Sequence, residues 1–192
     1  MDEMMMFRRN AILADLCKEW NNKWAACHDD KEKLMRLVLM QQSAPFFADF
    51  CYRGKGLTKE YCLREFGEYL NGRVFNDVEG VNGYTYSMFV GNDDNVEINV
   101  DVVQFLWCNA YITVPQCKCP VIYVSNRSKV HLVCEGCNNV RVYLFDKSDI
   151  TLEDVDENSS VTIYKYGDKA KVEIGKYCLS KKVKVFNKEL KL

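Results

Sequence analysis

Three stretches of the chain repeat one pattern, a serine followed two and four residues later by aliphatic side chains. They are Ser128-Lys129-Val130-His131-Leu132, Ser148-Asp149-Ile150-Thr151-Leu152 and Ser159-Ser160-Val161-Thr162-Ile163. Related segments lie at 111–114, 121–124, 140–142, 170–174 and 181–185. The apolar parts of the eight segments start at 111, 121, 130, 140, 150, 161, 172 and 183, in steps of 10, 9, 10, 10, 11, 11 and 11 residues. Alternation with a period of two predicts a series of short strands.

Two architectures have strands at this spacing. A β-solenoid with two strands per coil uses about 20 residues per turn, and an antiparallel sandwich or roll has turns every ~8–12 residues. A sandwich has no reason to repeat one motif in one phase, so the sequence favours the solenoid. The residues predicted to point inward are Val130/Leu132, Val140/Val142, Ile150/Leu152, Val161/Ile163, Val172/Ile174 and Val183/Val185. The residues between them are expected to form one outward column of His131, Arg141, Thr151, Thr162, Glu173 and Lys184.

The first 72 residues have a helical pattern instead, which predicts about four helices. Apolar residues from Met5 to Trp24 recur at helical spacing and predict one long amphipathic helix. Asp29 is placed to cap a second helix, the segment 44–54 is expected to form a third, and Thr58 is placed to cap a fourth. We therefore expect a helical domain or cap at 1–72 and a repetitive β domain at 73–192, with regular repeats from about 111.

Composition limits the classes of protein to which the chain can belong. Its 192 residues are 48% hydrophobic and 28% charged, with a net charge of −1, which is typical of a globular protein and calls for neither nucleic acid nor a membrane surface. The acidic N-terminal residues show no signal-peptide pattern, and the most apolar helical run, 34–40, contains Arg36. We expect reduced thiols and a cytoplasmic location.

Two features suggest an anionic partner, and each has a simpler explanation. Helices within 44–70 have the spacing of a helix-turn-helix, but residues 1–72 contain 11 Lys/Arg and 11 Asp/Glu, so no basic face is indicated. The C-terminal end, 161–192, contains 9 Lys/Arg against 3 Asp/Glu and is basic. This end can contact an anionic partner or can be a solvated end that prevents edge-to-edge pairing of strands. Attraction between the acidic 73–160 and the basic end of two copies is a third interpretation.

Four of the ten cysteines form two close pairs, Cys117-x-Cys119 and Cys134-x-x-Cys137. Two such pairs often hold a structural zinc ion. Cysteine is also an ordinary small core residue, and the chain uses it elsewhere at 17, 27, 51, 62, 108 and 178. No catalytic, cofactor-binding or metal-binding residue is therefore assigned from the sequence, and no cofactor is expected.

Several segments resemble proteins that phages and mobile elements of gut bacteria encode and that have no established activity. The segments are 51–61, 69–72, 80–86, 161–166 and 186–190. The resemblance implies a phage-related accessory or virion-associated protein and brings no functional residues. We expect a non-enzymatic interaction or structural protein whose partner is another protein or a second copy. The alternatives are a nucleic-acid-associated protein and a small glycan-directed solenoid enzyme.

Overall fold

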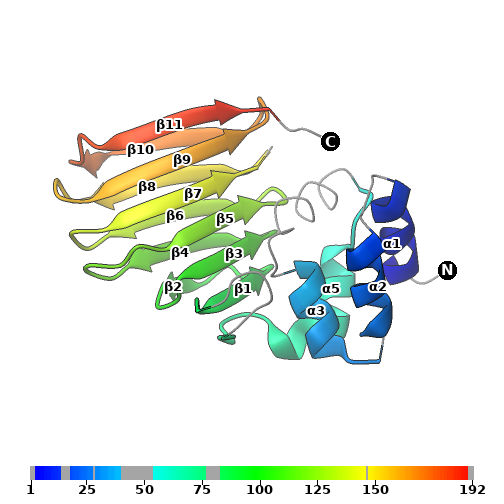
Figure 1. Ribbon diagram of the computed structural model, residues 1–192. Coiled ribbons are helices and arrows are strands. Elements are labelled where there is room, and N and C mark those ends of the chain that lie inside the picture. The colour runs from blue at the N-terminus through cyan, green and yellow to red at the C-terminus, as the bar shows by residue number, and fades with distance from the viewer. Residues whose placement is uncertain are drawn as a thin grey trace.

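The computed structural model describes residues 3–13, 18–27, 29–39, 54–76, 83–145 and 147–189. Within these ranges, four α-helices come first, followed by a short 3₁₀ helix and eleven strands (Figure 1). The helices are α1 (Glu3–Leu13), α2 (Lys18–Ala26), α3 (Lys31–Leu39), α5 (Lys59–Phe66) and η1 (Gly67–Tyr69). The strands are β1 (Tyr86–Val90), β2 (Asn95–Glu97), β3 (Val102–Leu106), β4 (Asn109–Val114), β5 (Val121–Ser125), β6 (Lys129–Cys134), β7 (Asn139–Leu144), β8 (Asp149–Val155), β9 (Ser160–Tyr166), β10 (Lys171–Cys178) and β11 (Val183–Lys188).

The strands form a parallel β-solenoid, which confirms the prediction. Odd-numbered strands make one sheet, in the order β1-β3-β5-β7-β9-β11, and even-numbered strands make the other, in the order β10-β8-β6-β4-β2. We call them sheet A and sheet B. Successive strands of one sheet are about 20 residues apart, as Asn109 and Lys129 show. The antiparallel sandwich or roll is wrong, because every strand pair in the two sheets is parallel.

The solenoid begins earlier than the sequence pattern indicated. Strands β1 and β3 belong to its first coils, although regular repeats were expected only from about 111. All five residues of each of these two strands are buried. A strand that is covered on both faces has no solvent-facing positions, so it shows no regular alternation of polar and apolar residues.

The outward column predicted from the sequence is wrong, because it mixes residues from the two sheets. His131, Thr151 and Glu173 are aligned on sheet B, whereas Arg141, Thr162 and Lys184 are aligned on sheet A. Consecutive segments of the repeat lie on opposite sides of the solenoid. Residues of one face therefore recur about every 20 residues, twice the spacing of the strands.

Helices α1 and α2 replace the single long helix that was predicted. The rings of Phe7 and Trp24 stack with centroids 5.2 Å apart, and Arg8 Nε donates to Asn21 Oδ1 at 2.7 Å. In one straight helix, Phe7 and Trp24 would be about 25 Å apart along the axis. The two helices are therefore not parts of one straight helix, and the Phe7–Trp24 stack holds them together.

The other helix starts agree more closely with the sequence. Asp30, rather than Asp29, accepts from the Lys33 N–H ahead of α3. Thr58 caps α5 as predicted, since its hydroxyl accepts from the Tyr61 N–H at 3.2 Å. The third predicted helix, within 44–54, lies almost entirely outside the described residues.

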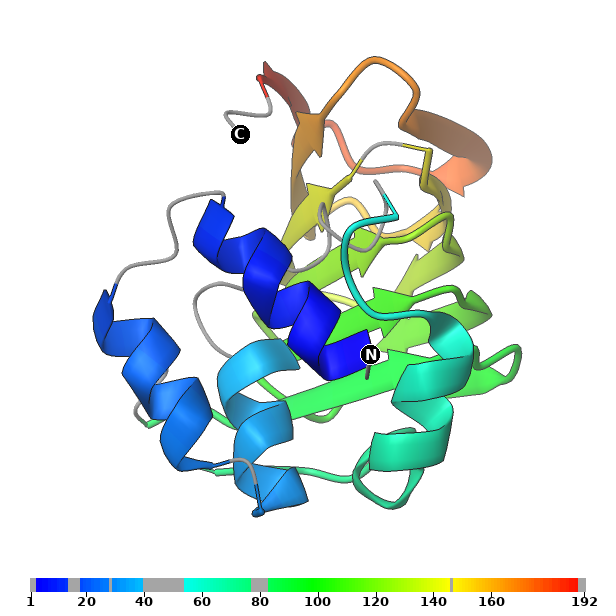
Figure 2. The ribbon, with the colours of Figure 1, turned by 90° about the vertical axis from the view of Figure 1, so that its right-hand side faces the viewer.

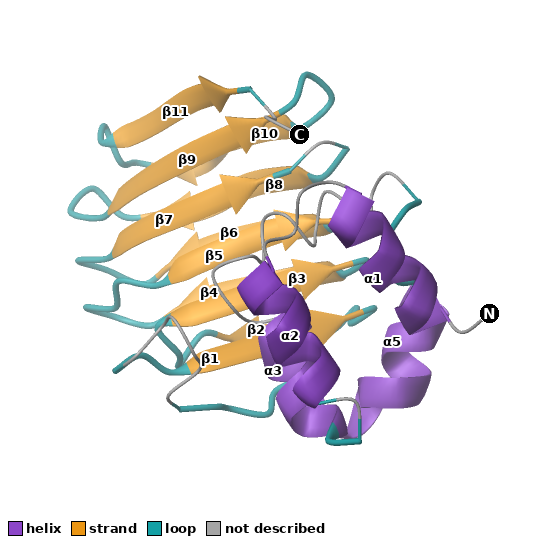
Figure 3. Cartoon of the chain, turned by 45° about the vertical axis from the view of Figure 1, so that its right-hand side comes forward, coloured by secondary structure: helices purple, strands orange, loops and turns teal. Residues whose placement is uncertain are grey.

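The helices cover the outer face of the first strands of sheet A, on one side of the β part (Figures 2 and 3). One buried cluster joins the helices to this face, and its members on β1 and β3 are Tyr86, Met88, Val90, Val102 and Leu106. Residues 71–76 then follow the free edge of β1. Asn71 N–H donates to the Met88 carbonyl at 2.8 Å, and Phe75 pairs with Tyr86 in an antiparallel bridge. This segment covers the edge at the N-terminal end of sheet A.

The core between the sheets is closed in the middle and open at its C-terminal end. The predicted inward residues from Val130 to Ile163 are all buried. In the last coil Val172 and Val183 are only partly buried, and Ile174 and Val185 are 60% and 43% exposed. The last coil has no further coil to cover it within the described residues. Its inward positions therefore face solvent.

The serine of the repeated motif has a structural role at Ser128. Its hydroxyl donates to the Ser125 carbonyl at 2.6 Å and accepts from the Cys108 N–H at 3.1 Å, while Ser128 itself is buried. The Ser128 hydroxyl therefore links its own turn to the preceding coil. Ser148, at the equivalent position one coil later, is equally buried, but its hydroxyl has no hydrogen-bond partner among the described residues.

Ser128→Ala should destabilise the fold, and Ser148→Ala should not. The first substitution leaves the buried Cys108 N–H without an acceptor, which costs about 1–3 kcal/mol. The second removes a buried hydroxyl that is already unpaired, so the free energy of unfolding should stay the same or rise. Urea denaturation of the two variants measures the difference. Equal losses would contradict the role given to the Ser128 hydroxyl.

The open end predicts unequal effects of two isoleucine substitutions in sheet B. Ile150→Ala removes a fully buried side chain and should lower the free energy of unfolding by about 2–5 kcal/mol. Ile174→Ala, at an inward position of the last coil, should change it by only about 0.5 kcal/mol, because Ile174 is 60% exposed. Urea denaturation followed by circular dichroism tests both. A large loss for Ile174→Ala would mean that another part of the protein covers the last coil.

Candidate binding surface

An aromatic ladder runs along the outer face of sheet A. Tyr123, Tyr143, Tyr164 and Phe186 lie at aligned positions of β5, β7, β9 and β11. Their rings stack with centroid separations of 4.9, 5.1 and 5.7 Å from β5 to β11. Beside the ladder, Phe145 stacks on Tyr166 at 5.2 Å. We call this surface, together with the outward charged residues of the same four strands, the tyrosine face.

Ring stacking decides which atoms the ladder offers to a partner. Each inner ring has its two faces against the neighbouring rings, so its edge and hydroxyl are left for other contacts. Sugars bind to the flat faces of aromatic rings. Among the described residues, one face of Phe186 and the face of Tyr123 toward Gln104 of β3 have no ring stacked on them. Burial raises the pKa of Tyr123 to about 12, with a further contribution from Tyr143. The Tyr123 phenol therefore stays protonated at neutral pH and can donate a hydrogen bond.

The charged residues of the tyrosine face are all cationic. Strands β5, β7, β9 and β11 contain no Asp or Glu, and their outward charged residues are Arg141, Lys184 and Lys188. Lys165 of β9 is aligned with the core residue Leu144 and does not share this face. Lys188 Nζ lies 5.8 Å from the centroid of the Tyr164 ring. Sheet B has mixed charge by comparison, because β6, β8 and β10 also contain Asp149, Glu153, Asp154 and Glu173. On that sheet Glu153 lies 2.6 Å from His131 Nδ1.

The tyrosine face continues a surface that the protein already uses for docking. On β1 and β3 the outer face of sheet A is apolar except for the buried Gln104 and packs against the helices. Strands β7, β9 and β11 rise beyond the helices in Figures 1 and 3. The same sheet therefore binds the protein's own helices at one end and presents aromatic and cationic side chains at the other.

A groove of about 380 Å³ lies among the helices. Trp24, Leu34, Tyr61 and Phe66 form part of its lining, together with Met4, Met5, Arg8, Lys31 and Glu65. The indole N–H of Trp24 is buried and has no hydrogen-bond partner within the described ranges. The groove can therefore take an apolar group that has a hydrogen-bond acceptor.

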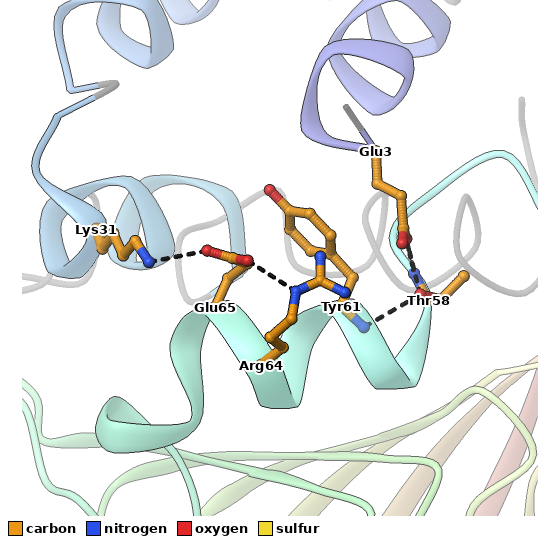
Figure 4. Close-up of polar contacts among 6 residues, drawn as sticks. All are labelled: Glu3, Lys31, Thr58, Tyr61, Arg64 and Glu65. Carbon is orange, nitrogen blue, oxygen red and sulfur yellow. Dashed lines mark hydrogen bonds and ion pairs between the residues drawn. The ribbon is translucent and has the colours of Figure 1, made fainter. Parts of the chain in front are cut away.

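The polar side chains beside this groove are already paired with one another (Figure 4). Glu65 accepts from Lys31 at 2.8 Å and from Arg64 at 2.9 Å, and these two contacts, Lys31 first, lower the pKa of Glu65. Arg64 also lies over the ring of Tyr61 at 5.0 Å. Thr58 donates to the Glu3 carboxylate at 2.7 Å and so ties α5 to α1.

These contacts involve residues of the helix-turn-helix that the spacing within 44–70 suggested. Arg64 is paired with Glu65, and the opposite side of α5 is buried through Tyr61, Cys62 and Phe66. Asn10 donates to the Lys55 carbonyl at 2.7 Å, so the glycine turn at 54–56 contacts α1. The first helix of the expected pair lies almost entirely outside the described residues.

The basic C-terminal end surrounds the open coil. Lys171, Lys176, Lys184 and Lys188 lie on β10 and β11, and Lys181 and Lys182 lie in the turn between them. Apolar side chains are exposed at the same end, namely Ile174, Tyr177, Leu179, Val185 and Phe186. Cations at a strand edge hinder pairing with another chain and also attract anions, including the acidic residues of a second copy.

The four cysteines considered as zinc ligands differ in their exposure to solvent. Cys134 is buried in the solenoid core, where burial raises the pKa of its thiol to about 12. Cys117, Cys119 and Cys137 are exposed in turns. Among the described residues, no three His, Cys, Asp or Glu side chains are grouped to hold a metal ion. A zinc ion needs thiolates, so the structure does not assemble the four-thiol site.

Cys134→Val should leave the protein folded and equally stable. Cys134 is aligned with Val114 on one side and Val155 on the other, so valine fits the same column of the core. The free energy of unfolding should change by less than about 1 kcal/mol. Thermal unfolding with and without a chelator provides the measurement. A chelator-sensitive melting temperature that the substitution abolishes would instead support a metal site.

The chain has no match among protein-family models, curated proteins or solved structures. Within the described residues, no helix is long and apolar enough to cross a membrane.

Proposed function

We propose that this chain is a non-enzymatic binding protein that holds an acidic segment of a protein partner on the tyrosine face. The observation that carries the proposal is the chemistry of four adjacent strands, where a stacked row of aromatic side chains is accompanied by cations alone. Tyrosine and arginine are the residues that contribute most often to binding energy at protein interfaces.

The rigidity of the face supports this function. The ladder side chains are held by their stacking neighbours and by a sheet with continuous parallel pairing. Little side-chain freedom is left to lose on binding, which favours affinity. Arg141 and Lys184 are exposed and have no ion pair among the described residues. Both cations are therefore available to carboxylates of a partner.

The alternatives fit the tyrosine face less well. A glycan-directed enzyme needs two converging carboxylates, and the four strands of the face have none. Nucleic acid would use the same cations, but base stacking needs open ring faces, and the inner rings of the ladder are covered. A role as a phage or mobile-element accessory protein remains part of the proposal, in which the partner would be another protein of the same element.

Self-assembly is the second candidate, and the open coil favours it. Ile174 and Val185 occupy core positions but remain largely exposed. A second copy that covers this end would bury them. Light scattering of the protein alone, at increasing concentration and salt, measures this association directly.

Charge reversal on the two sheets tests the tyrosine face. Arg141→Glu with Lys184→Glu changes two exposed positions that flank β9 on sheet A. Lys129→Glu with Lys171→Glu makes the same change at two exposed positions that flank β8 on sheet B. Fluorescence anisotropy with a labelled peptide rich in glutamate and tyrosine should show affinity about tenfold weaker for the sheet A variant, and nearly unchanged for the sheet B variant.

A labelled duplex DNA of similar charge serves as the competing probe. Equal losses of peptide binding in the two variants would show a general charge effect and contradict the proposed face. Binding of DNA without binding of the peptide would overturn the proposal in favour of nucleic acid. Circular dichroism of each variant confirms that the solenoid is intact.

A further inference from the structure

Two exposed cysteines occupy the same position in successive coils. Val114 is aligned with Cys134 before the turn, and Val121 is aligned with Arg141 after it, both with an offset of 20 residues. The backbone bonds of the turn keep this offset: Cys117 N–H donates to the Gly136 carbonyl at 2.9 Å, and Asn139 N–H donates to the Lys118 carbonyl at 3.1 Å. Cys117 is therefore aligned with Cys137.

The backbone gives the two side chains matching directions. Cys117 has a φ of 61° and Cys137 a φ of 51°, so both lie in the left-handed region. Both thiols are exposed on the same edge of the solenoid. Aligned residues in neighbouring strands are about 4.8 Å apart. Disulfide-bonded cysteines have Cα atoms about 4.4–6.8 Å apart, so the spacing suits a disulfide.

The neighbouring thiols lack this arrangement. Cys119 is exposed in the same turn, but it is aligned with Asn139. Cys134 points into the core, and burial raises the pKa of its thiol to about 12. Burial likewise raises the pKa of Cys108 to about 11. The pairs that lie close in the sequence are 117/119 and 134/137. The fold instead aligns Cys117 with Cys137.

The coil above supports the position of Cys137. The Asp156 carboxylate accepts hydrogen bonds from the Ser159 hydroxyl and from the Asn158 N–H, and these bonds, the Ser159 hydroxyl first, lower its pKa. The N–H of Asn138, directly after Cys137, donates to the same Ser159 hydroxyl at 2.9 Å. The Asn138 side chain donates to the Pro115 carbonyl at 2.6 Å, which ties the turn of Cys137 to the turn of Cys117. The two turns are thus connected both to each other and to the next coil.

We propose that Cys117 and Cys137 form a dithiol site that a low-molecular-weight disulfide, such as glutathione disulfide, converts to an intramolecular disulfide. One protein thiolate attacks the small disulfide, forms a mixed disulfide and releases one small thiol. The second protein thiolate then attacks the protein sulfur of the mixed disulfide and releases the second small thiol. Two protein S–H bonds are replaced by one S–S bond, the two protons end on the released thiols, and the small disulfide is reduced.

The disulfide would join two coils at one edge of the solenoid. It would close a loop of about 20 residues, which restricts the unfolded chain and raises stability. An excess of small thiol reverses the reaction, so the stability of the coils would follow the thiol–disulfide poise of the surroundings. The proposal does not rest on the function of the tyrosine face, and its test needs no partner.

The test treats the full-length reduced protein with glutathione disulfide, then alkylates the remaining thiols and maps the peptides by mass spectrometry. The expected product has a direct link between Cys117 and Cys137 and two fewer free thiols. Its thermal unfolding temperature should lie above that of the reduced protein. Reduction by excess glutathione should restore the original temperature.

Three serine variants test which cysteines form the link. Cys117→Ser and Cys137→Ser should each lose the internal link and retain one glutathione on the remaining cysteine. Cys119→Ser is the matched control and should form the link as the unsubstituted protein does. A link from Cys119 to either thiol, or glutathione attached to Cys117 and Cys137 without a link between them, would overturn the proposal. The peptide map of the unsubstituted protein decides the matter even if a variant fails to fold.

Discussion

The parallel register between successive coils is the constraint on which the rest of this structure depends. A coil of about 20 residues brings each residue beside its equivalent in the next coil, and backbone hydrogen bonds hold that alignment through both strands and turns. Like residues therefore accumulate in columns. Val114, Cys134 and Val155 make a column in the core, and the tyrosines make one outside. Changing one residue affects the coils on both sides of it.

This register also explains what the sequence could and could not predict. The spacing of 9–11 residues between the segments correctly predicted the strands from 111 onward and the solenoid itself. The spacing alone did not show that consecutive strands belong to opposite sheets, so His131 and Arg141 were assigned to one column. When the sequence is compared at twice that spacing, Tyr123 and Tyr143 fall together, as do Cys117 and Cys137. The signal for both surfaces was present at the longer period.

The first coils and the helices were harder to predict because tertiary contacts decide them. Strand β3 is covered by the solenoid core on one face and by the helices on the other, so its sequence, Val102-Val103-Gln104-Phe105-Leu106, lacks alternation. The break between α1 and α2 has no proline or glycine to indicate it. The Phe7–Trp24 stack joins residues that a continuous helix would separate, and such a contact cannot be predicted from helical spacing.

The tyrosine face and the aligned thiols depend on the same two coils. The turn with Cys117 leads directly into β5, which carries Tyr123, and the turn with Cys137 leads into β7, which carries Arg141 and Tyr143. Any bond between those turns would fix the starting points of both strands. The distance between the Tyr123 and Tyr143 rings depends on the relative position of β5 and β7. A disulfide at the edge of the solenoid would therefore limit movement of the ladder. A surface that is already rigid loses less conformational freedom when a partner binds, and so the edge of the solenoid is well placed to influence binding on its face.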